Sequence, residues 1–408
     1  MKQEIFAGLD VGSGRVLGAV AVKNPETEVL EVTGHSSAAC RGIRGGVVVN
    51  IAEASRIITQ VVEDMEEQIQ QTIGGIYLGV RGGHLQTFNN RGAYNIARTD
   101  KEITAEDVQA VIENAKAIPI SNDREILHVI PQGFSLDRQK GVPNPVGMEG
   151  TLLEVEVHIV TASSSHLNNL FKAVNEAGFQ VNQPVYSLLG TGELVVSQEE
   201  KELGSLLIDF GGQTVGVLVY AEGSVRFSKE LSLGSDLITR DLAYGLRTSI
   251  PVAQQIREKY GAASSSMLNG EEDVEFVGMD GRTTRKIKRR TLVEIIQPRV
   301  EEIFSFIGDE LQNCGYADVV VPGGAILTGE GALLHGIPEA AEQILGMPVR
   351  LGLPRNDLHG PQEILTDPSY AAVLGLFRFG GMLEWGLPMQ RKKSVWKRKI
   401  SSIFEDLF

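Results

Sequence analysis

Two short stretches of this chain place an aspartate directly before a glycine-rich turn. Asp10-Val-Gly-Ser-Gly-Arg and Asp209-Phe-Gly-Gly-Gln-Thr each follow one apolar strand and precede another, which predicts a β-hairpin. Backbone N–H groups in a tight glycine turn can converge on phosphate oxygens. A carboxylate at the end of the first strand can hold Mg²⁺ through its water ligands. The pair therefore predicts a phosphate site, with Asp10 and Asp209 as the residues that hold Mg²⁺ through water.

A third glycine-rich turn occurs near the end of the chain. Residues 319–334 predict a strand, a turn and the start of a helix, and they contain most of the motif ILTGEGALLHGI at 326–337. A strand, turn and helix in this order can receive a nucleoside or a phosphate. An ordinary turn would explain each of the three segments singly, but their combination favours phosphate binding.

The elements around these turns indicate an α/β protein with two lobes. The two hairpin segments lie about 200 residues apart and each opens a run of three strands, which indicates an internal duplication. A helix is predicted over 52–72 and a buried strand over 76–80. Residues 235–262 predict helices, 264–290 a small polar hairpin and 291–315 a long helix. A chain of 408 residues also exceeds what one hydrophobic core usually holds.

A compact insert interrupts the first lobe over residues 84–160. Its strand-like pieces are Leu85–Asn89, Tyr94–Ile96, Ile126–Pro131 and Leu152–Val160. One helix is predicted after Thr104, whose hydroxyl is suited to cap it, and Asp107 follows three residues later.

Charge and cysteine content restrict the class of function. The formal net charge of −14 disfavours nucleic acid as a partner. Cys40 and Cys314 have no CxxC spacing, and His84, His128 and His158 have no ligand spacing. We therefore expect a cytosolic protein without a disulfide framework or a zinc site. No apolar run approaches the roughly 18–20 residues that span a bilayer.

The last segment predicts a helix that binds a membrane surface. Apolar residues share one helical face and basic residues lie near the helix start, namely Trp396, Ile400, Ile403, Phe404 and Leu407, with Lys397, Arg398 and Lys399. We expect residues 395–408 to bind an anionic membrane reversibly, after a linker at 382–394. The alternative is a terminal helix packed on the body, against which the polar linker argues.

The three turns together resemble those of the actin, Hsp70 and sugar-kinase ATPase superfamily. Within it, the chain resembles the bacterial cell-division family FtsA over essentially its full length. The stretches that carry this resemblance are 124–150, 153–162, 233–243, 289–303 and 367–380. The resemblance implies an α/β, actin-like two-lobed fold built on duplicated ribonuclease H-like cores. It also implies an FtsA-type 1C insert subdomain and a C-terminal amphipathic helix.

The resemblance also implies a division of the chain into subdomains. The expected segments are 1–83 (1A), 84–162 (1C), 163–190 (1A), 191–240 (2A), 241–314 (2B), 315–360 (2A), 361–381 (a return to 1A), 382–394 (linker) and 395–408 (membrane helix).

Residue roles follow from the same resemblance. The expected contacts are Gly12, Ser13, Gly14 and Arg15 in the first phosphate loop, Gly211, Gly212, Gln213 and Thr214 in the second, Gly329, Gly331 and Ala332 beside the adenosine, and Gly234, Gln254 and Arg257 near the ribose and base. Several positions depart from the family pattern, namely Arg15, Gln213, Gln254, Arg257 and Glu330. Glu193 is the one candidate for a water-activating base, with a solvated surface glutamate as the alternative. Binding survives such departures more easily than catalysis does, so we expect ATP binding with slow or absent turnover.

The resemblance implies an adaptor at the division site. Such a protein polymerises beneath the cytoplasmic membrane, tethers filaments of the tubulin homologue FtsZ by their C-terminal peptide and recruits other division proteins through its insert. Arg289 and Arg299 are candidates for holding that peptide, and plain surface charge is the equal alternative. ATP would then act mainly as a structural ligand that holds the two lobes in one closure state.

Three other functions remain open at this point. A sugar or acetate-type kinase would need an acceptor pocket and a base near the γ-phosphate. A pilus-assembly adaptor like PilM would share the fold but has no obvious need for the C-terminal anchor. A filament protein like MreB would carry its membrane element at the N-terminus and would lack the insert.

Overall fold

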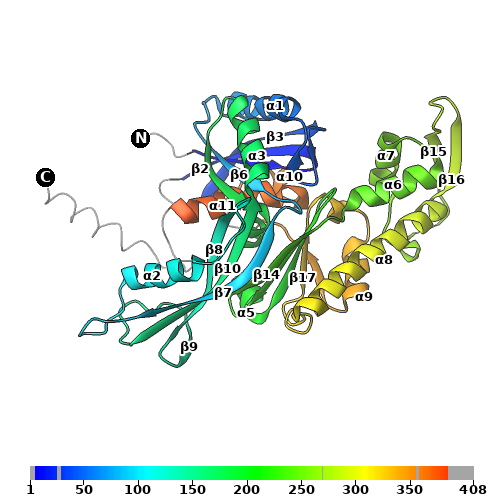
Figure 1. Ribbon diagram of the computed structural model, residues 1–408. Helices are drawn as coiled ribbons and strands as arrows, with labels where there is room; N and C mark the ends of the chain where they lie inside the picture. Colours follow the sequence, from blue (N-terminus) through cyan, green and yellow to red (C-terminus); the bar gives the residue numbers. More distant parts are fainter. Residues whose placement is uncertain (1–4, 25–28, 269, 355–357, 385–408) are drawn as a thin grey trace.

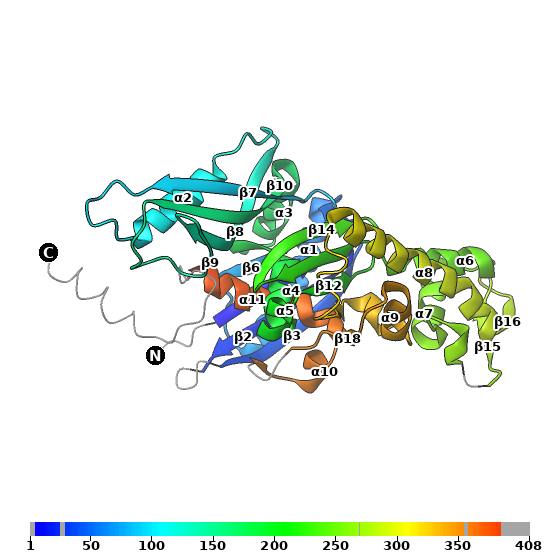
Figure 2. The same cartoon turned by 90° about the horizontal axis from the view of Figure 1, so that it is seen from below.

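The computed structural model describes residues 5–24, 29–268, 270–354 and 358–384. Two sheets of similar design lie side by side, with a third sheet and a mainly helical part projecting from them in different directions (Figures 1 and 2). The predicted membrane helix at 395–408 and the linker from residue 385 onward lie outside the described residues. The last described helix, α11, ends at Glu384, so the linker does not begin at residue 382 as the sequence predicted.

The first lobe contains a six-stranded sheet in the order β11-β6-β1-β2-β3-β19. Its strands are β1 (Ile5–Val11), β2 (Gly14–Lys23), β3 (Leu30–Cys40), β6 (Ile76–Val80), β11 (Val181–Tyr186) and β19 (Leu358–His359). β1, β2 and β3 are antiparallel, and β6 and β11 run parallel to β1. All five residues of β6 are buried, as expected for a strand with both faces covered. A small hairpin, β4 (Ile43–Arg44) and β5 (Val47–Val48), follows β3.

Helices cover both faces of this sheet. They are α1 (Ile51–Ile69), α3 (Ser164–Glu176), α4 (Ser187–Val195), α10 (Gln362–Leu365) and α11 (Ala371–Glu384). Glycines let the strands approach these helices closely. A Cβ on Gly18 would lie 2.7 Å from Val61 and Met65 of α1, and a Cβ on Gly8 would lie 2.8 Å from the carbonyl oxygen of Val373 in α11.

The second lobe repeats the design of the first. Its sheet has the order β14-β13-β12-β17-β18, with β12 (Ser205–Phe210), β13 (Val215–Ala221), β14 (Ser224–Leu231), β17 (Ala325–Thr328) and β18 (Val349–Leu351). β12, β13 and β14 are antiparallel, and β17 and β18 run parallel to β12. Order and direction match β3-β2-β1-β6-β11 strand for strand. The internal duplication inferred from the two hairpins is confirmed by this topology.

Helices and a hairpin extend the second lobe. They are α5 (Gln198–Leu203), α6 (Ser235–Leu246), α7 (Ile250–Tyr260), α8 (Arg289–Cys314), α9 (Ile337–Leu345), β15 (Asp273–Val277) and β16 (Thr284–Lys288). The hairpin of β15 and β16 stands at the far end of α8, beyond α6 and α7 (Figure 1). Residues 319–321, predicted as part of a strand, precede β17 and form turns. The helix expected after the third glycine turn is a single 3₁₀ turn at Glu330–Leu333, and α9 begins only at Ile337.

The insert forms a separate layer with its own core. Its sheet has the order β7-β10-β8-β9, with β7 (Gln86–Asn95), β8 (Arg124–Leu136), β9 (Gln139–Val142) and β10 (Leu152–Ser163). Helix α2 (Ala105–Lys116) packs on it and begins with the capping box of Thr104 and Asp107, as predicted. The two short strands expected at 85–89 and 94–96 are one strand, β7. β7 is continuous because it pairs with β10 from Gln86 to Asn95. A Cβ on Gly92 would lie 2.4 Å from the Val111 carbonyl oxygen of α2, so the helix packs closely on the strand at this point.

A crossing of two helices lies between the lobes. α4 and α11 pack against each other between the two sheets (Figure 2). They meet at a pair of glycines: a Cβ on Gly375 would lie 2.3 Å from the backbone of Gly190. The insert is fastened to the second lobe by His158, whose Nδ1 lies 2.7 Å from Asn89 Oδ1 and whose Nε2 lies 2.8 Å from Ser228 Oγ of β14.

Candidate functional site

Equivalent turns carry the two aspartates. In the first hairpin Gly12 N–H donates to the Arg15 carbonyl at 3.0 Å, and in the second Gly211 N–H donates to the Thr214 carbonyl at 3.0 Å. Asp10 and Asp209 are almost fully buried, with 3% and 4% of their surface exposed. Asp10 also accepts a hydrogen bond from Ser187 Oγ at 2.8 Å. The duplicated chain therefore presents two similar turns, each with a buried carboxylate at its base.

Arg81 joins the two carboxylates across the lobes. It follows β6 directly, and β6 lies beside β1 with Gly79 opposite Asp10. The Arg81 guanidinium donates from Nη2 to Asp209 Oδ2, and its Nε lies 3.7 Å from Asp10 Oδ1. Only 13% of the Arg81 side chain is exposed. The predicted Mg²⁺ ligands are thus brought together, but around a cationic side chain that sequence reasoning missed. A charged residue at the carboxyl end of a buried parallel strand was the signal that could have revealed it.

Burial and opposite charge shape the protonation of this cluster. Burial alone lowers the pKa of Arg81, but Asp10 and Asp209 outweigh it and raise that pKa above its ordinary value. Burial raises the pKa of Asp209 against the opposing effect of Arg81. Burial likewise raises the pKa of Glu230 to about 7, although Arg81 lowers it. Arg81 is therefore a permanent cation among groups that burial pushes toward neutrality.

The third turn packs onto the second hairpin. Gly329 has a φ of +87°, and a Cβ there would lie 2.5 Å from the Phe210 carbonyl oxygen and 2.6 Å from Asp209 Oδ1. A Cβ on Gly331 would meet the Phe210 ring at 2.6 Å, and Ala332 is buried. Glycine is thus required at 329 both by its backbone conformation and by the close approach to Asp209.

The three turns converge on one place. A Cβ on Gly212 would lie 2.8 Å from Glu330 Oε1 and 3.4 Å from the Ser13 carbonyl oxygen. Glu330 Oε2 lies 3.9 Å from Arg15 Nη2. Residues of both hairpins and of the third turn therefore surround Gly212.

Side chains also connect the turns across the lobes. Gly45 N–H donates to Gln213 Oε1 at 3.0 Å, and Gly46 N–H donates to Ser13 Oγ at 2.9 Å. Gln213 Nε2 donates in turn to Asp236 Oδ2 at 3.0 Å. The loop of β4 and β5 thus bridges the two predicted phosphate loops, and nothing in the sequence pattern had pointed to it.

The residues expected near ribose and base separate into two groups. Gly234 lies against the second loop, because a Cβ there would be 2.2 Å from the Gly212 carbonyl oxygen. Arg257 is buried and donates from Nη1 to the Ser235 carbonyl at 2.7 Å. Gln254 is exposed and donates to Glu258 one turn further along α7, at 2.9 Å. Arg257 therefore supports the start of α6, whereas Gln254 faces solvent.

Glu193 lies apart from the turns, with other partners. Its carboxylate accepts from Lys201 Nζ at 2.6 Å, and that ammonium lies 5.0 Å from the Tyr220 ring centroid. Only 14% of the Glu193 side chain is exposed. Tyr220 is near the end of β13 that is remote from the hairpin turn. The structure thus corrects both interpretations of Glu193: it forms a largely buried ion pair and is neither a solvated glutamate nor a neighbour of Asp10 and Asp209.

Arg289 and Arg299, the candidates for a partner peptide, already have acidic neighbours. Arg289 Nη1 lies 3.0 Å from Glu272 Oε2, and Arg299 binds Asp241 through two nitrogens at 2.6 and 3.2 Å. About a quarter of each side chain is exposed, 27% for Arg289 and 28% for Arg299. An acidic ligand would therefore have to replace these neighbours or share the cations with them.

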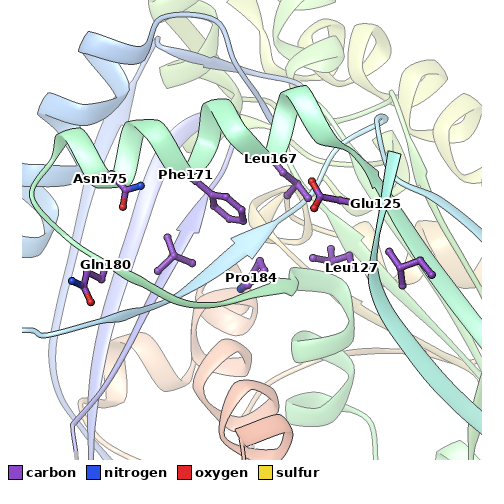
Figure 3. Close-up of a pocket in the computed structure, with 9 residues that line it drawn as sticks. Glu125, Leu127, Leu167, Phe171, Asn175, Gln180 and Pro184 are labelled. Atoms are coloured by element: carbon purple, nitrogen blue, oxygen red, sulfur yellow. The ribbon is translucent and has the colours of Figure 1, made fainter. Parts of the chain in front are cut away.

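A cavity of about 510 Å³ opens between β8, α3 and β11, away from the three turns. Figure 3 shows Leu167 and Phe171 from α3 facing Leu127 of β8 and Pro184 of β11 across it. Glu125 is the one titratable residue of its lining, so this cavity offers little chemistry.

In the part of the chain that the structure describes, no group of three or more His, Cys, Asp or Glu residues is placed to hold a metal ion. Among those same residues, no helix is long and apolar enough to cross a bilayer. His84, His128 and His158 are instead part of the packing: His128 Nε2 accepts from the Tyr186 N–H at 3.0 Å, and burial lowers the pKa of all three to about 4.

Comparisons with solved structures support the fold. The chain is similar to a protein of the PilM-PilN type IV pilus biogenesis complex, with a TM-score of 0.67 and 15% identity over 92% of this chain and 98% of that one. It is also similar to MreB5 of Spiroplasma citri bound to ADP, with a TM-score of 0.56 and 12% identity over 95% and 99% of the two chains. At these identities the likeness concerns the fold alone, which is the actin-like fold.

Comparisons of sequence identify the family. The model of cell division protein FtsA matches residues 206–375, and the model of the SHS2 domain inserted in FtsA matches 82–161. Cell division protein FtsA of Neisseria meningitidis serogroup B is 34% identical over 98% of this chain and 95% of its own length. The FtsA proteins of Borreliella burgdorferi, with 36% identity over 98% and 96%, and of Escherichia coli K12, with 30% over 93% and 90%, are similar too. This chain therefore belongs to the FtsA family of actin-like cell-division proteins.

Proposed function

We propose that this chain binds ATP between its two lobes, with the phosphates held by the two hairpin turns and the adenosine beside the third. The observation that carries the proposal is the convergence of all three turns around Gly212. Backbone N–H groups of glycine turns suit phosphate oxygens, and the arginine forks of Arg15 and Arg81 lie at the same place. The nucleotide serves as a structural ligand with slow or absent turnover, since Glu193 is engaged with Lys201.

Calorimetric titration of ATP into the full chain tests this site. Gly212→Val fills the point of convergence, because even a Cβ would lie 2.8 Å from Glu330, and we expect it to abolish binding. Gly133→Ala in the insert is the matched control, since its Cβ would meet nothing within 4 Å. Wild-type chain that binds no ATP, or G212V that binds as well as wild type, would refute the site.

The wider role that we propose is an adaptor on the cytoplasmic face of the membrane at the division site. Membership of the FtsA family supports self-assembly into filaments, tethering of FtsZ filaments and recruitment of further division proteins through the insert at 84–162. The amphipathic pattern of 395–408 supports attachment to an anionic membrane. One short helix binds reversibly, and assembly of many copies multiplies its effect. A PilM-like role is the second candidate, supported only by the shared fold.

Co-sedimentation with anionic vesicles tests the membrane role. The full chain is compared with a chain truncated after Lys393 and with Ile403→Glu, each with and without Mg·ATP. We expect the full chain to pellet with vesicles, the other two to stay in solution, and ATP to increase pelleting through lobe closure and assembly. Equal behaviour of all three chains would favour the PilM-like role.

The second partner that we propose is the acidic C-terminal peptide of FtsZ, held at the start of α8. The support is a cluster of basic residues within 285–290. Arg299 lies further along the same helix, α8. Peptide binding by fluorescence anisotropy is measured for Arg289→Glu, with the exposed Arg282→Glu at the hairpin tip as control. Loss of affinity in R289E alone supports the site, and unchanged affinity removes Arg289 from it.

A further inference from the structure

The Arg81 guanidinium lies beside both Asp10 and Asp209. The sequence predicts that these two carboxylates hold Mg²⁺ through its water ligands, but the residues present do not fit that ion. The Arg81 guanidinium donates from Nη2 to Asp209 Oδ2, and its Nε lies 3.7 Å from Asp10 Oδ1. A divalent ion between the same carboxylates would have to displace a buried cation that cannot lose its proton.

The backbone around Arg81 holds this side chain in place. A Cβ on Gly46 would lie 2.2 Å from the Arg81 carbonyl oxygen, and a Cβ on Gly82, which has a φ of +114°, would lie 2.4 Å from the Gly45 carbonyl oxygen of the same loop. A Cβ on Gly79 would lie 2.7 Å from Asp10 Oδ1, so β6 approaches Asp10 closely just before Arg81. The close packing of the β4–β5 loop on residues 81 and 82 leaves the arginine little room to leave the carboxylates.

The guanidinium also faces the second phosphate loop. Its Nη1 lies 3.6 Å from the position that a Cβ on Gly211 would take, and its buried Nε has no hydrogen-bond partner among the residues that the structure describes. An arginine fork can bind carboxylate and phosphate oxygens at once through different N–H groups. Arg81 can therefore do what a bridging metal does: neutralise the two carboxylates and present positive charge to a phosphate.

We propose that Arg81 takes the place of a divalent cation between Asp10 and Asp209, so that this chain binds its nucleotide without a metal at these carboxylates. The nucleotide half of this inference rests on the proposed function, whereas the exclusion of metal from the carboxylates does not. Arg81 is thus a specificity-determining residue, and its ligands are the two carboxylates and the phosphate oxygens of a nucleoside polyphosphate.

The first experiment uses Mg²⁺ alone, without nucleotide. Thermal melting of the full chain, of Arg81→Ser and of Arg81→Lys is followed by circular dichroism in EDTA and in excess MgCl₂. We expect Mg²⁺ to raise the melting temperature of R81S only, because that variant presents two carboxylates without a counter-charge. R81K keeps the charge and is the matched control. Two results would overturn the assignment. The first is a wild-type chain that Mg²⁺ stabilises, with the effect lost in Asp209→Asn. The second is a folded R81S whose melting temperature does not respond to Mg²⁺.

The second experiment needs only the wild-type chain and therefore decides the matter even if R81S does not fold. ATP is titrated calorimetrically in EDTA and in MgCl₂, and we expect the two dissociation constants to agree within about threefold. Binding that is tighter by about tenfold or more in MgCl₂ overturns the inference and leaves the nucleotide site standing. Absence of binding in both buffers refutes the nucleotide site. The melting experiment alone then tests whether Arg81 excludes a metal ion from the two carboxylates.

Discussion

Replacing Gly375 by alanine should loosen the helix crossing between the lobes. A Cβ at this position would lie 2.3 Å from both the carbonyl carbon and oxygen of Gly190, and 2.7 Å from Thr191 N. These are backbone atoms, so no rotamer change relieves the clash, and α4 and α11 must separate by about 1 Å to restore an ordinary contact. Overpacking of this kind costs about 3 kcal/mol at its upper range. The better helix propensity of alanine returns about 1 kcal/mol, which leaves a net loss of about 2 kcal/mol.

Urea unfolding followed by circular dichroism measures this loss, and two other glycines calibrate it. A Cβ on Gly190 would lie 3.0 Å from the Gly375 backbone, so Gly190→Ala should cost less than Gly375→Ala. Gly308 lies inside α8 with nothing closer than 3.8 Å to its added Cβ. Gly308→Ala should therefore stabilise the chain by up to about 1 kcal/mol. If G375A is as stable as wild type, or if G308A destabilises the chain equally, the close-packing argument is wrong.

Three further outcomes are expected. Thr104→Ala removes the cap of α2 and should lower the free energy of unfolding by about 1 kcal/mol in urea melts. Thr104→Ser keeps a capping hydroxyl and should retain most of this stability. Burial lowers the pKa of His158 from its ordinary value of 6.5 to about 4 in the folded chain. Between pH 6.5 and pH 4 the unfolded chain therefore protonates this histidine, whereas the folded chain keeps it neutral. Stability should therefore fall as pH drops from 6.5 toward 4, by up to about 3 kcal/mol for this group, and His158→Asn should show a flatter pH dependence in urea melts. Glu330→Ala removes a carboxylate beside Gly212 and should tighten ATP binding several-fold in calorimetry. An unchanged affinity would show that Glu330 does not face the phosphates.

Local pattern was a good guide wherever neighbouring residues decide the structure. The two Asp-glycine hairpins were predictable because alternating apolar strands and a tight turn are short-range features. The capping box at Thr104 was predictable for the same reason. The pattern failed between residues 89 and 94, where two separate strand pieces were predicted and the single strand β7 runs through. The strand is continuous because it pairs with β10 from Gln86 to Asn95, and that pairing depends on the fold of the whole insert.

The candidate site was only partly accessible to sequence reasoning. The turns at 12–15, 211–214 and 329–332 were identified because glycine-rich turns after apolar strands are conspicuous. Glu193 was misinterpreted, because its partner Lys201 lies on the next helix and only the packing of α4 against β13 brings the pair beside Tyr220. The acidic neighbours of Arg289 and Arg299 were hidden for the same reason, since Glu272 and Asp241 are distant in the chain.

The sequence by itself determined the duplicated hairpins, the two-lobed α/β fold and the FtsA resemblance, because these depend on repeated local patterns. Only the tertiary structure decided what stands between the two aspartates. Asp10 lies on β1, Asp209 lies on β12 and Arg81 directly follows β6, and their meeting depends on how β6 lies beside β1 and how the two lobes close. The ion pairs of Arg81 with the two aspartates form only when segments far apart in the sequence pack together. A pattern within one segment therefore cannot show that an arginine already lies between carboxylates suited to a metal.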